Sequence, residues 1–143
     1  DWLREAGIAA RVSDGSGLSR RNRTTPRELV RLLDHMHGTE RLAVPFRASL
    51  AVACGSGTLA GRMCRTRAAG HCRGKTGTLT GVSGLSGYCD VGSGRVVAFS
   101  ILMNRVGYYS ARRLQDGMIA AIASYVPSSF SKAGSSMTST PSR

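Results

Sequence analysis

Hydrophobic and polar residues alternate along the chain with two different periods, and each period predicts a different kind of element. Helical spacing dominates the N-terminal part, where residues 2–10 have the pattern of a helix end. A helix is predicted to begin after Thr25, because Thr25, Pro26 and Glu28 match a capping box with proline at the first helical position. Its apolar stripe continues to Gly38, which ends it.

Further helices are predicted on both sides of a central region. Residues 46–53 and 57–64 have the apolar spacing of two short helices. A C-terminal helix is expected to begin at Ser110 and to stop at Pro127. Its expected buried side consists of Leu114, Met118, Ile119, Ile122 and Tyr125.

The central region changes to the two-residue period of β-strands. Residues 71–79 and 84–90 read as strands around a turn at Thr80-Gly81, and residues 95–103 form the clearest strand. One face of this last strand carries Val97, Phe99, Ile101 and Met103. Helices followed by three antiparallel strands and a covering helix predict an α+β fold, an antiparallel sheet with flanking helices.

Two segments lack apolar periodicity. Residues 13–23 consist almost entirely of turn-forming residues and predict a long loop, which in a compact domain is often functional. Residues 127–143 are rich in serine and threonine and predict a disordered tail. Residues 1–126 are therefore expected to be the folded part.

The four cysteines permit two disulfides. If Thr80-Gly81 is a hairpin turn, paired residues have numbers that add to 161, so Cys72 opposes Cys89. Opposed cysteines at a non-hydrogen-bonded position come close enough for a disulfide. The alternative is two free buried thiols, and the sequence does not decide whether Cys54 and Cys64 pair.

The composition is strongly basic, with 20 lysine and arginine residues against 8 acidic ones. The arginines are spread along the chain rather than clustered, and aromatic residues make up only 6%. A base-stacking surface is therefore not expected, and no nucleic-acid motif is present. We expect no signal peptide within this sequence, and no apolar run is long enough to cross a bilayer. His71 and Cys72 are a candidate metal pair, but the cysteine spacings match no common zinc module and no metal site is expected.

Lys75 is the only lysine before the predicted tail, and it lies in the segment Gly74-Lys75-Thr76-Gly77-Thr78. A phosphate-binding loop ends in Gly-Lys-Thr, but that pattern needs glycine at position 69, which is alanine, and a following helix. A strand pattern follows instead. The better match is the Lys-Thr-Gly strand of active-site serine penicillin-binding enzymes, where an edge strand offers amides and hydroxyls to a substrate carboxylate.

Several other motifs resemble one family in the same order and spacing. Residues 14–22, which read Asp-Gly-Ser-Gly-Leu-Ser-Arg-Arg-Asn, resemble the signature loop of the D-alanyl-D-alanine carboxypeptidase/endopeptidase family, the low-molecular-mass class C penicillin-binding proteins. Residues 56–59, 75–88 and 110–116 are similar to that family's Gly-Thr-Leu, active-site strand and C-terminal helix segments. The resemblance implies the C-terminal part of a domain similar to penicillin-binding proteins and serine β-lactamases.

The resemblance implies roles for individual residues. Lys75 resembles the lysine that stabilises charge and helps proton transfer, and the backbone N–H of Thr78 resembles an oxyanion donor. Thr76, Gly77 and Thr78 resemble the residues that hold the substrate carboxylate and let its backbone approach. The signature-loop residues are expected to be structural rather than catalytic; they are Asp14, Gly15, Ser16, Arg20 and Asn22.

Two catalytic elements of that family are not matched. The only Ser-x-x-Lys runs from Ser129 to Lys132, in the predicted tail, and is interpreted as accidental because a nucleophile must be fixed beside its base. Ser-x-Asn is absent, since the residues two before Asn22 and Asn104 are arginine and leucine. We therefore expect a fragment that is inactive alone.

The resemblance implies a serine-type peptidase that cleaves the terminal D-Ala–D-Ala bond of peptidoglycan stem peptides through an acyl-serine. It implies binding of β-lactams, no metal and no organic cofactor, and a location outside the cytoplasmic membrane, in the periplasm or cell wall. The alternative hypothesis is a non-catalytic basic module that binds a cell-wall polymer through its arginines. The sequence does not indicate the oligomeric state.

Overall fold

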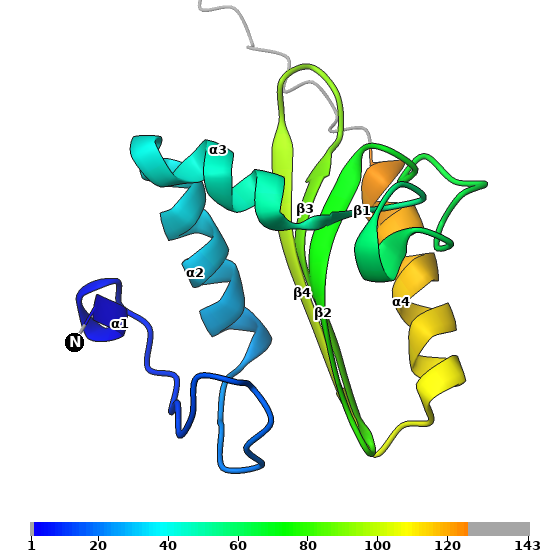
Figure 1. Ribbon diagram of the computed structural model, residues 1–143. Helices are drawn as coiled ribbons and strands as arrows, with labels where there is room; N and C mark the ends of the chain where they lie inside the picture. Colours follow the sequence, from blue (N-terminus) through cyan, green and yellow to red (C-terminus); the bar gives the residue numbers. More distant parts are fainter. Residues whose placement is uncertain (1, 126–143) are drawn as a thin grey trace, which may run out of the picture.

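The structure is a computed structural model that describes residues 2–125, so the predicted tail at 127–143 lies outside the described residues (Figure 1). Four β-strands form one antiparallel sheet in the order β1-β2-β3-β4. The elements, in chain order, are α1 (Trp2–Glu5), α2 (Pro26–Gly38), α3 (Glu40–Ser49), β1 (Ala51–Val52), the 3-10 helix η1 (Gly57–Leu59), β2 (Cys72–Leu79), β3 (Val82–Asp90), β4 (Val96–Asn104) and α4 (Tyr108–Ala123).

Helices cover both faces of the sheet, as Figure 1 shows: α2 lies on one side and α4 on the other. This confirms the predicted α+β fold with flanking helices. The sheet has one strand more than expected, because the short β1 pairs with Arg73 and Gly74 at the outer edge of β2. Within residues 2–125, no helix combines the length and hydropathy needed to cross a membrane.

The predicted start of α2 is confirmed in detail. The Thr25 hydroxyl accepts a hydrogen bond from the Glu28 N–H at 3.2 Å, and the Glu28 carboxylate accepts one from the Thr25 N–H at 2.7 Å. Pro26 occupies the first helical position, where its missing N–H costs no hydrogen bond. Local sequence alone therefore determines where this helix begins.

The two short helices predicted at 46–53 and 57–64 are wrong. The structure instead has α3 from Glu40 to Ser49, which continues through Pro45, and then β1 and η1. Proline is unfavourable in the interior of a helix, and α3 nevertheless contains one. Packing of α3 against α2 outweighs that local preference, and β1 depends on a partner strand more than twenty residues away.

The buried side predicted for the C-terminal helix is only partly confirmed: Ile119 is buried and Ile122 packs against the core, but the other three residues are not buried. The helix begins at Tyr108, two residues before Ser110, and Leu114, Met118 and Tyr125 are 52%, 47% and 57% exposed. The side that faces the sheet carries Ala111, Gln115, Ile119 and Ala123. The alanine side chains are small and allow the helix to approach the sheet closely, with Leu114 and Met118 on its outer side.

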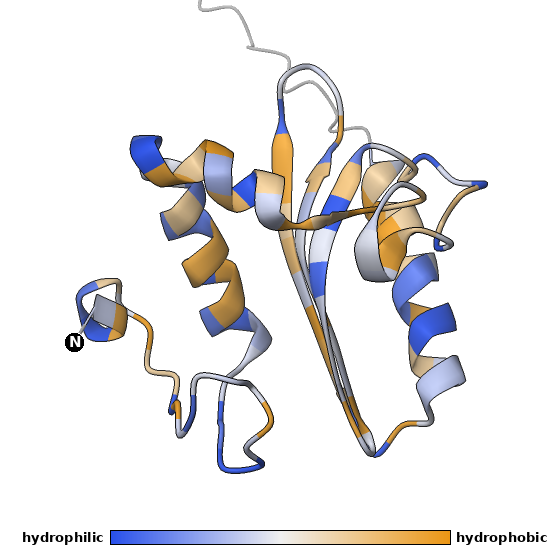
Figure 2. Ribbon diagram, in the orientation of Figure 1, coloured by the Kyte–Doolittle hydropathy of each residue, from blue (hydrophilic) through white to orange (hydrophobic). Residues whose placement is uncertain are grey.

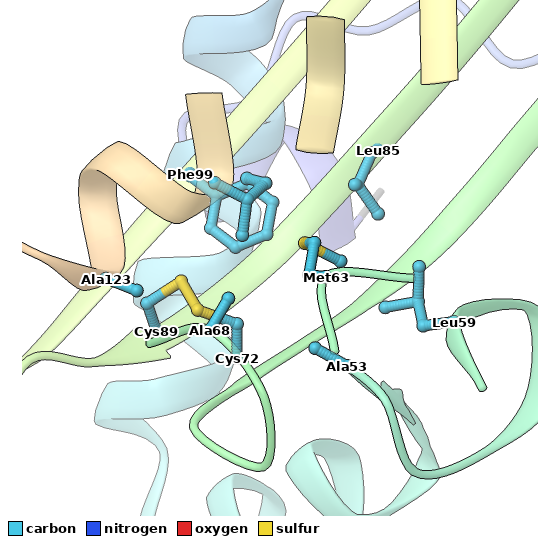
Figure 3. Close-up of a cluster of buried hydrophobic side chains, with 10 residues drawn as sticks. Ala53, Leu59, Met63, Ala68, Cys72, Leu85, Cys89, Phe99 and Ala123 are labelled. Carbon is cyan, nitrogen blue, oxygen red and sulfur yellow. A yellow bond between two sulfur atoms is a disulfide. The ribbon is translucent and has the colours of Figure 1, made fainter. Parts of the chain in front are cut away.

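The predicted hairpin register is confirmed, since Cys72 pairs with Cys89 and the two form a disulfide. Figure 3 shows this disulfide inside the larger core cluster, between the sheet and α4. Cys54 and Cys64, which the sequence left open, form a second disulfide that closes the loop around η1. The cluster also contains Phe99, at the centre of β4, as the predicted strand face requires.

A smaller cluster lies on the other face, between the sheet and α2. It consists of Leu33, Leu50 and Tyr88, with Phe46 packed against it. The Tyr88 hydroxyl donates a 2.6 Å hydrogen bond to the Leu33 carbonyl, and burial raises the pKa of Tyr88 to about 12. This hydrogen bond connects the sheet to α2 and keeps the phenol neutral at physiological pH.

Candidate active site

The lysine of the Lys-Thr-Gly segment lies on β2, as predicted, at the border of the sheet. β1 covers only Arg73 and Gly74. Among residues 2–125, no strand pairs with the outer side of β2 from Lys75 to Leu79. This part of β2 is therefore an open strand edge beside the loop that carries η1.

The hydrogen-bond pattern determines which amides point toward this open edge. The Ala53 N–H donates to the Cys72 carbonyl from the outer side, and the Asp90 N–H donates to the His71 carbonyl from the β3 side. Backbone groups of an antiparallel strand alternate in direction every residue. The N–H and C=O groups of Thr76 and Thr78 therefore point outward, toward a space that an extended peptide could occupy.

Side chains along the open edge alternate between the two faces. Thr76 and Thr78 lie on the α4 side, the face of the buried Cys72, whereas Lys75 and Gly77 lie on the α2 side. The Lys75 ammonium group donates a 2.7 Å hydrogen bond to the Thr76 carbonyl, one of the outward-pointing groups. A positive charge, two hydroxyls and two N–H groups thus converge on the same stretch of strand.

A hollow of about 530 Å³ lies next to Lys75 on the α2 side of the sheet. Figure 2 shows hydrophobic residues on α2 and on the strands of the sheet. Its walls are mainly apolar side chains of α2, α3 and the sheet, among them Leu29, Leu32, Phe46 and Leu102. The ammonium group therefore lies at the rim of an apolar depression.

Thr58 is a site residue that the sequence analysis did not assign. The Thr76 hydroxyl donates to the Thr58 hydroxyl at 3.0 Å. Thr58 belongs to η1, in the loop that the disulfide between Cys54 and Cys64 closes. The signal in the sequence was the Gly-Thr-Leu motif, but its function could not be read without the fold that brings it to β2.

The signature loop is held together by the carboxylate of Asp14. It accepts hydrogen bonds from the Ser16 hydroxyl, from the Asn22 side-chain amide at 2.7 Å and from the Ser19 N–H at 3.1 Å. The hydrogen bonds from Ser16 and Asn22 lower the pKa of Asp14 below its usual value. A Cβ atom at Gly15 would meet nothing within 4 Å, so no close contact requires glycine at this position.

Arg20 connects the signature loop to the sheet. Its guanidinium donates a 3.0 Å hydrogen bond to the Thr80 carbonyl, in the turn that joins β2 to β3. The loop thus lies at the end of the same strand that carries Lys75. Thr80 is five residues further along the chain than Lys75. The signature loop therefore supports the end of the strand and does not lie beside the Lys75 ammonium group.

A buried polar network supports β3 from the α4 side. The Arg62 guanidinium is 4% exposed and forms an ion pair with Asp116 at 2.7 Å. It also donates a 3.1 Å hydrogen bond to the side-chain oxygen Oε1 of Gln115. The Gln115 amide donates to the Ser83 hydroxyl at 3.0 Å. Because Ser83 pairs with Thr78, the network fixes α4 and the η1 loop against the active-site strand.

The described part of the chain has no group of three or more His, Cys, Asp or Glu side chains arranged to hold a metal ion. His71 and Cys72 do not form a metal site, because the Cys72 sulfur is bonded to Cys89.

Residues 2–125 match the family described as D-Ala-D-Ala carboxypeptidase 3 (S13), and the chain belongs to this family. It is 42% identical over 119 residues to a D-alanyl-D-alanine carboxypeptidase of Actinomadura sp., an alignment that covers 80% of this chain and 22% of the relative. It is 38% identical over 130 residues to carboxypeptidase DacB of Mycolicibacterium smegmatis, covering 85% and 28%. The chain thus spans about a quarter of the length of these relatives.

The fold is similar to that of penicillin binding protein 4 (dacB) from Haemophilus influenzae. A structure of that protein in complex with a β-lactam superposes with a TM-score of 0.76 at 24% identity, over 87% of this chain and 32% of that one. A second structure gives a TM-score of 0.74 at 25% identity, over 86% and 30%. The sheet with α2 and α4 on opposite faces is therefore a penicillin-binding-protein fold element.

Proposed function

We propose that this chain is the part of a serine-type D-Ala-D-Ala carboxypeptidase that binds the substrate along its Lys-Thr-Gly strand. The observation that carries the proposal is the open edge of β2, where Lys75 and the outward N–H groups of Thr76 and Thr78 lie together. Membership of the family supports the substrate, which is the D-Ala–D-Ala end of a peptidoglycan stem peptide. A β-lactam would bind at the same edge, as an analogue of that end.

The chemistry assigned to this edge is recognition and charge stabilisation. The Thr76 and Thr78 hydroxyls would donate hydrogen bonds to the terminal carboxylate, and the Thr78 N–H would donate to the oxygen of the scissile carbonyl as charge develops there. The Lys75 ammonium group would add positive potential beside both. Gly77 has open space where a side chain would stand, so a substrate backbone can approach β2.

The nucleophile is not assigned to any residue of this chain. Ser129 and Lys132 lie outside the described residues, and the sequence has no Ser-x-Asn. We therefore propose that the 143-residue chain neither forms an acyl-enzyme nor hydrolyses D-Ala–D-Ala by itself. The activity would belong to a longer product of the same gene, working outside the cytoplasmic membrane, where disulfides persist.

A fluorescent penicillin tests this proposal on two proteins, the 143-residue chain and the longer gene product. We expect covalent labelling of the longer product only, with the labelling rate reduced by about 100-fold or more in Lys75→Met. Arg95→Met, which removes an exposed charge at the hairpin before β4, is the matched control and should label normally. Labelling of the short chain, or normal labelling of Lys75→Met, would contradict the assignment.

Salt-sensitive binding of either protein to peptidoglycan, with no labelling and no release of D-alanine, would favour the basic polymer-binding module instead. The observation that favours this second function is the net charge of +12, which would attract an anionic polymer.

A further inference from the structure

A second hollow lies behind the open edge of β2, on the face opposite Lys75. It has a volume of about 100 Å³, which limits its occupant to a group of a few heavy atoms. The Thr76 and Thr78 side chains form one wall, and Thr58, Tyr108 and Arg112 lie around it. The lining is therefore rich in hydroxyls and contains two guanidinium groups, those of Arg62 and Arg112.

Arg112 and Arg62 both line this hollow, but only one of them has a free charge. The Arg62 guanidinium is neutralised by Asp116 at 2.7 Å. Arg112 has no carboxylate partner within residues 2–125. Its charge is therefore available to a ligand, although the side chain is partly buried.

The Arg112 guanidinium is held in place by two contacts with the side chain of Tyr108. It donates a 2.6 Å hydrogen bond to the Tyr108 hydroxyl and lies 5.2 Å from the centre of the Tyr108 ring. Both contacts leave the charge intact and fix the planar group in one position, which reduces the entropy lost when it binds an anion. The side chain is thus arranged as a binding group rather than as half of an ion pair.

Thr58 completes the arrangement. The hydroxyl of Thr76 donates to that of Thr58, which leaves the Thr58 proton free to point into the hollow and to donate to an acceptor such as a carboxylate oxygen. The disulfide between Cys54 and Cys64 closes the loop that brings Thr58 here. A carboxylate placed at the strand edge would meet hydroxyls from both segments.

From these contacts we propose that Arg112, with Thr58, forms the rear half of the carboxylate subsite at β2, so that the substrate's terminal carboxylate lies between Lys75 on one face and Arg112 on the other. This rests on the proposed function. Arg112 supplies a planar cation that can donate two parallel hydrogen bonds to one carboxylate, a geometry that an ammonium group does not offer. It is a specificity residue, which favours peptides that end in a free carboxylate.

The test measures how Arg112 affects the preference for an acid over an amide. The isotope-labelled chain is titrated with N-acetyl-D-Ala-D-Ala and with the same peptide ending in a carboxamide, and backbone amide shifts are followed in Thr76 to Thr78. We expect the wild-type chain to bind the acid about tenfold or more tightly than the amide. In Arg112→Gln that ratio should fall by about tenfold, with weaker loss in Arg112→Lys.

Arg113→Gln is the matched control, because Arg113 is the next residue of the same helix and is exposed. It should keep the wild-type ratio. If Arg112→Gln weakens both peptides equally, or keeps the preference for the acid, the inference is wrong. Penicillin labelling of the longer product does not depend on this ratio. Normal labelling with an unchanged acid-to-amide ratio in Arg112→Gln would therefore contradict only the role of Arg112. Absent labelling with a reduced ratio would contradict only the proposed function.

Discussion

The two faces of the sheet differ in how completely they are packed. On the α4 face, the larger core cluster encloses the disulfide between Cys72 and Cys89, and Ile119 and Phe99 are buried against it. On the α2 face, only Leu33, Leu50 and Tyr88 are buried, and a mainly apolar hollow of about 530 Å³ lies between α2 and the sheet.

This difference explains how one strand can serve both stability and binding. The buried half of β2, near Cys72, is fixed by the disulfide and by β1, whereas its open half presents Lys75 toward the less packed face. Binding groups need a rigid support but also need space beside them. Here the α4 face supplies the support, and the α2 face and the strand edge supply the space.

The largest effect that we predict separates two glycines of the same sheet. A methyl group at Gly87 would lie 2.0 Å from the Arg73 carbonyl oxygen, whereas one at Gly77, on the α2 face, would meet nothing within 4 Å. We expect Gly87→Ala to cost about 3 kcal/mol or more and to prevent stable folding, because the two backbones must separate. Gly77→Ala should keep the fold, as measured by urea denaturation. Equal loss in both would contradict the difference in packing.

The second prediction compares core truncations on the two faces. Ile119→Ala should destabilise the protein by about 3–4 kcal/mol, since Ile119 is fully buried against the sheet and the surroundings cannot collapse into the space. Leu33→Ala should cost about 2 kcal/mol, because Leu33 already borders the open hollow. Both values come from the free energy of unfolding in urea. A larger loss in Leu33→Ala would show that the α2 face is the tighter one.

The sequence was most informative where local rules act alone. The capping box at Thr25 and the hairpin turn at Thr80-Gly81 located α2 and two strands, and the register that follows from the turn gave the pairing of Cys72 with Cys89. A two-residue period combined with a short turn leaves few possible strand registers. The position of Lys75 on a strand could therefore be predicted as well.

The sequence was least informative where contacts between distant segments determine the local structure. α3 continues through Pro45 because it packs on α2, and the buried side of α4 uses alanines that no hydrophobic pattern highlights. Thr58 and Arg112 reach the site from segments that are about 20 and 35 residues from Thr76, so only the tertiary structure brings them together. The Gly-Thr-Leu motif marked Thr58 without indicating its contact with Thr76, and Arg112 is one of many arginines in the chain.

The smallest predicted effect concerns the two loops, which are held by different means. The loop that carries Thr58 is closed by a disulfide, whereas residues 13–23 depend on the Asp14 carboxylate. Because its hydrogen bonds lower the pKa of Asp14, their stabilisation is present above the ordinary value of 3.8 and is lost as the pH falls through the lower folded-state value.

Acidification from neutral pH to about pH 2 should therefore shift the Ser19 and Asn22 amide resonances, with Thr58 unchanged until global unfolding begins. Asp14→Asn should make the first loop mobile already at neutral pH and remove its acid transition, while Asp90→Asn, at the exposed end of β3, should retain it. Amide hydrogen exchange measures both. If residues 13–23 and the Thr58 loop opened together at the same pH, the carboxylate would not be the group that holds the signature loop, and the contrast between the two loops would have another cause.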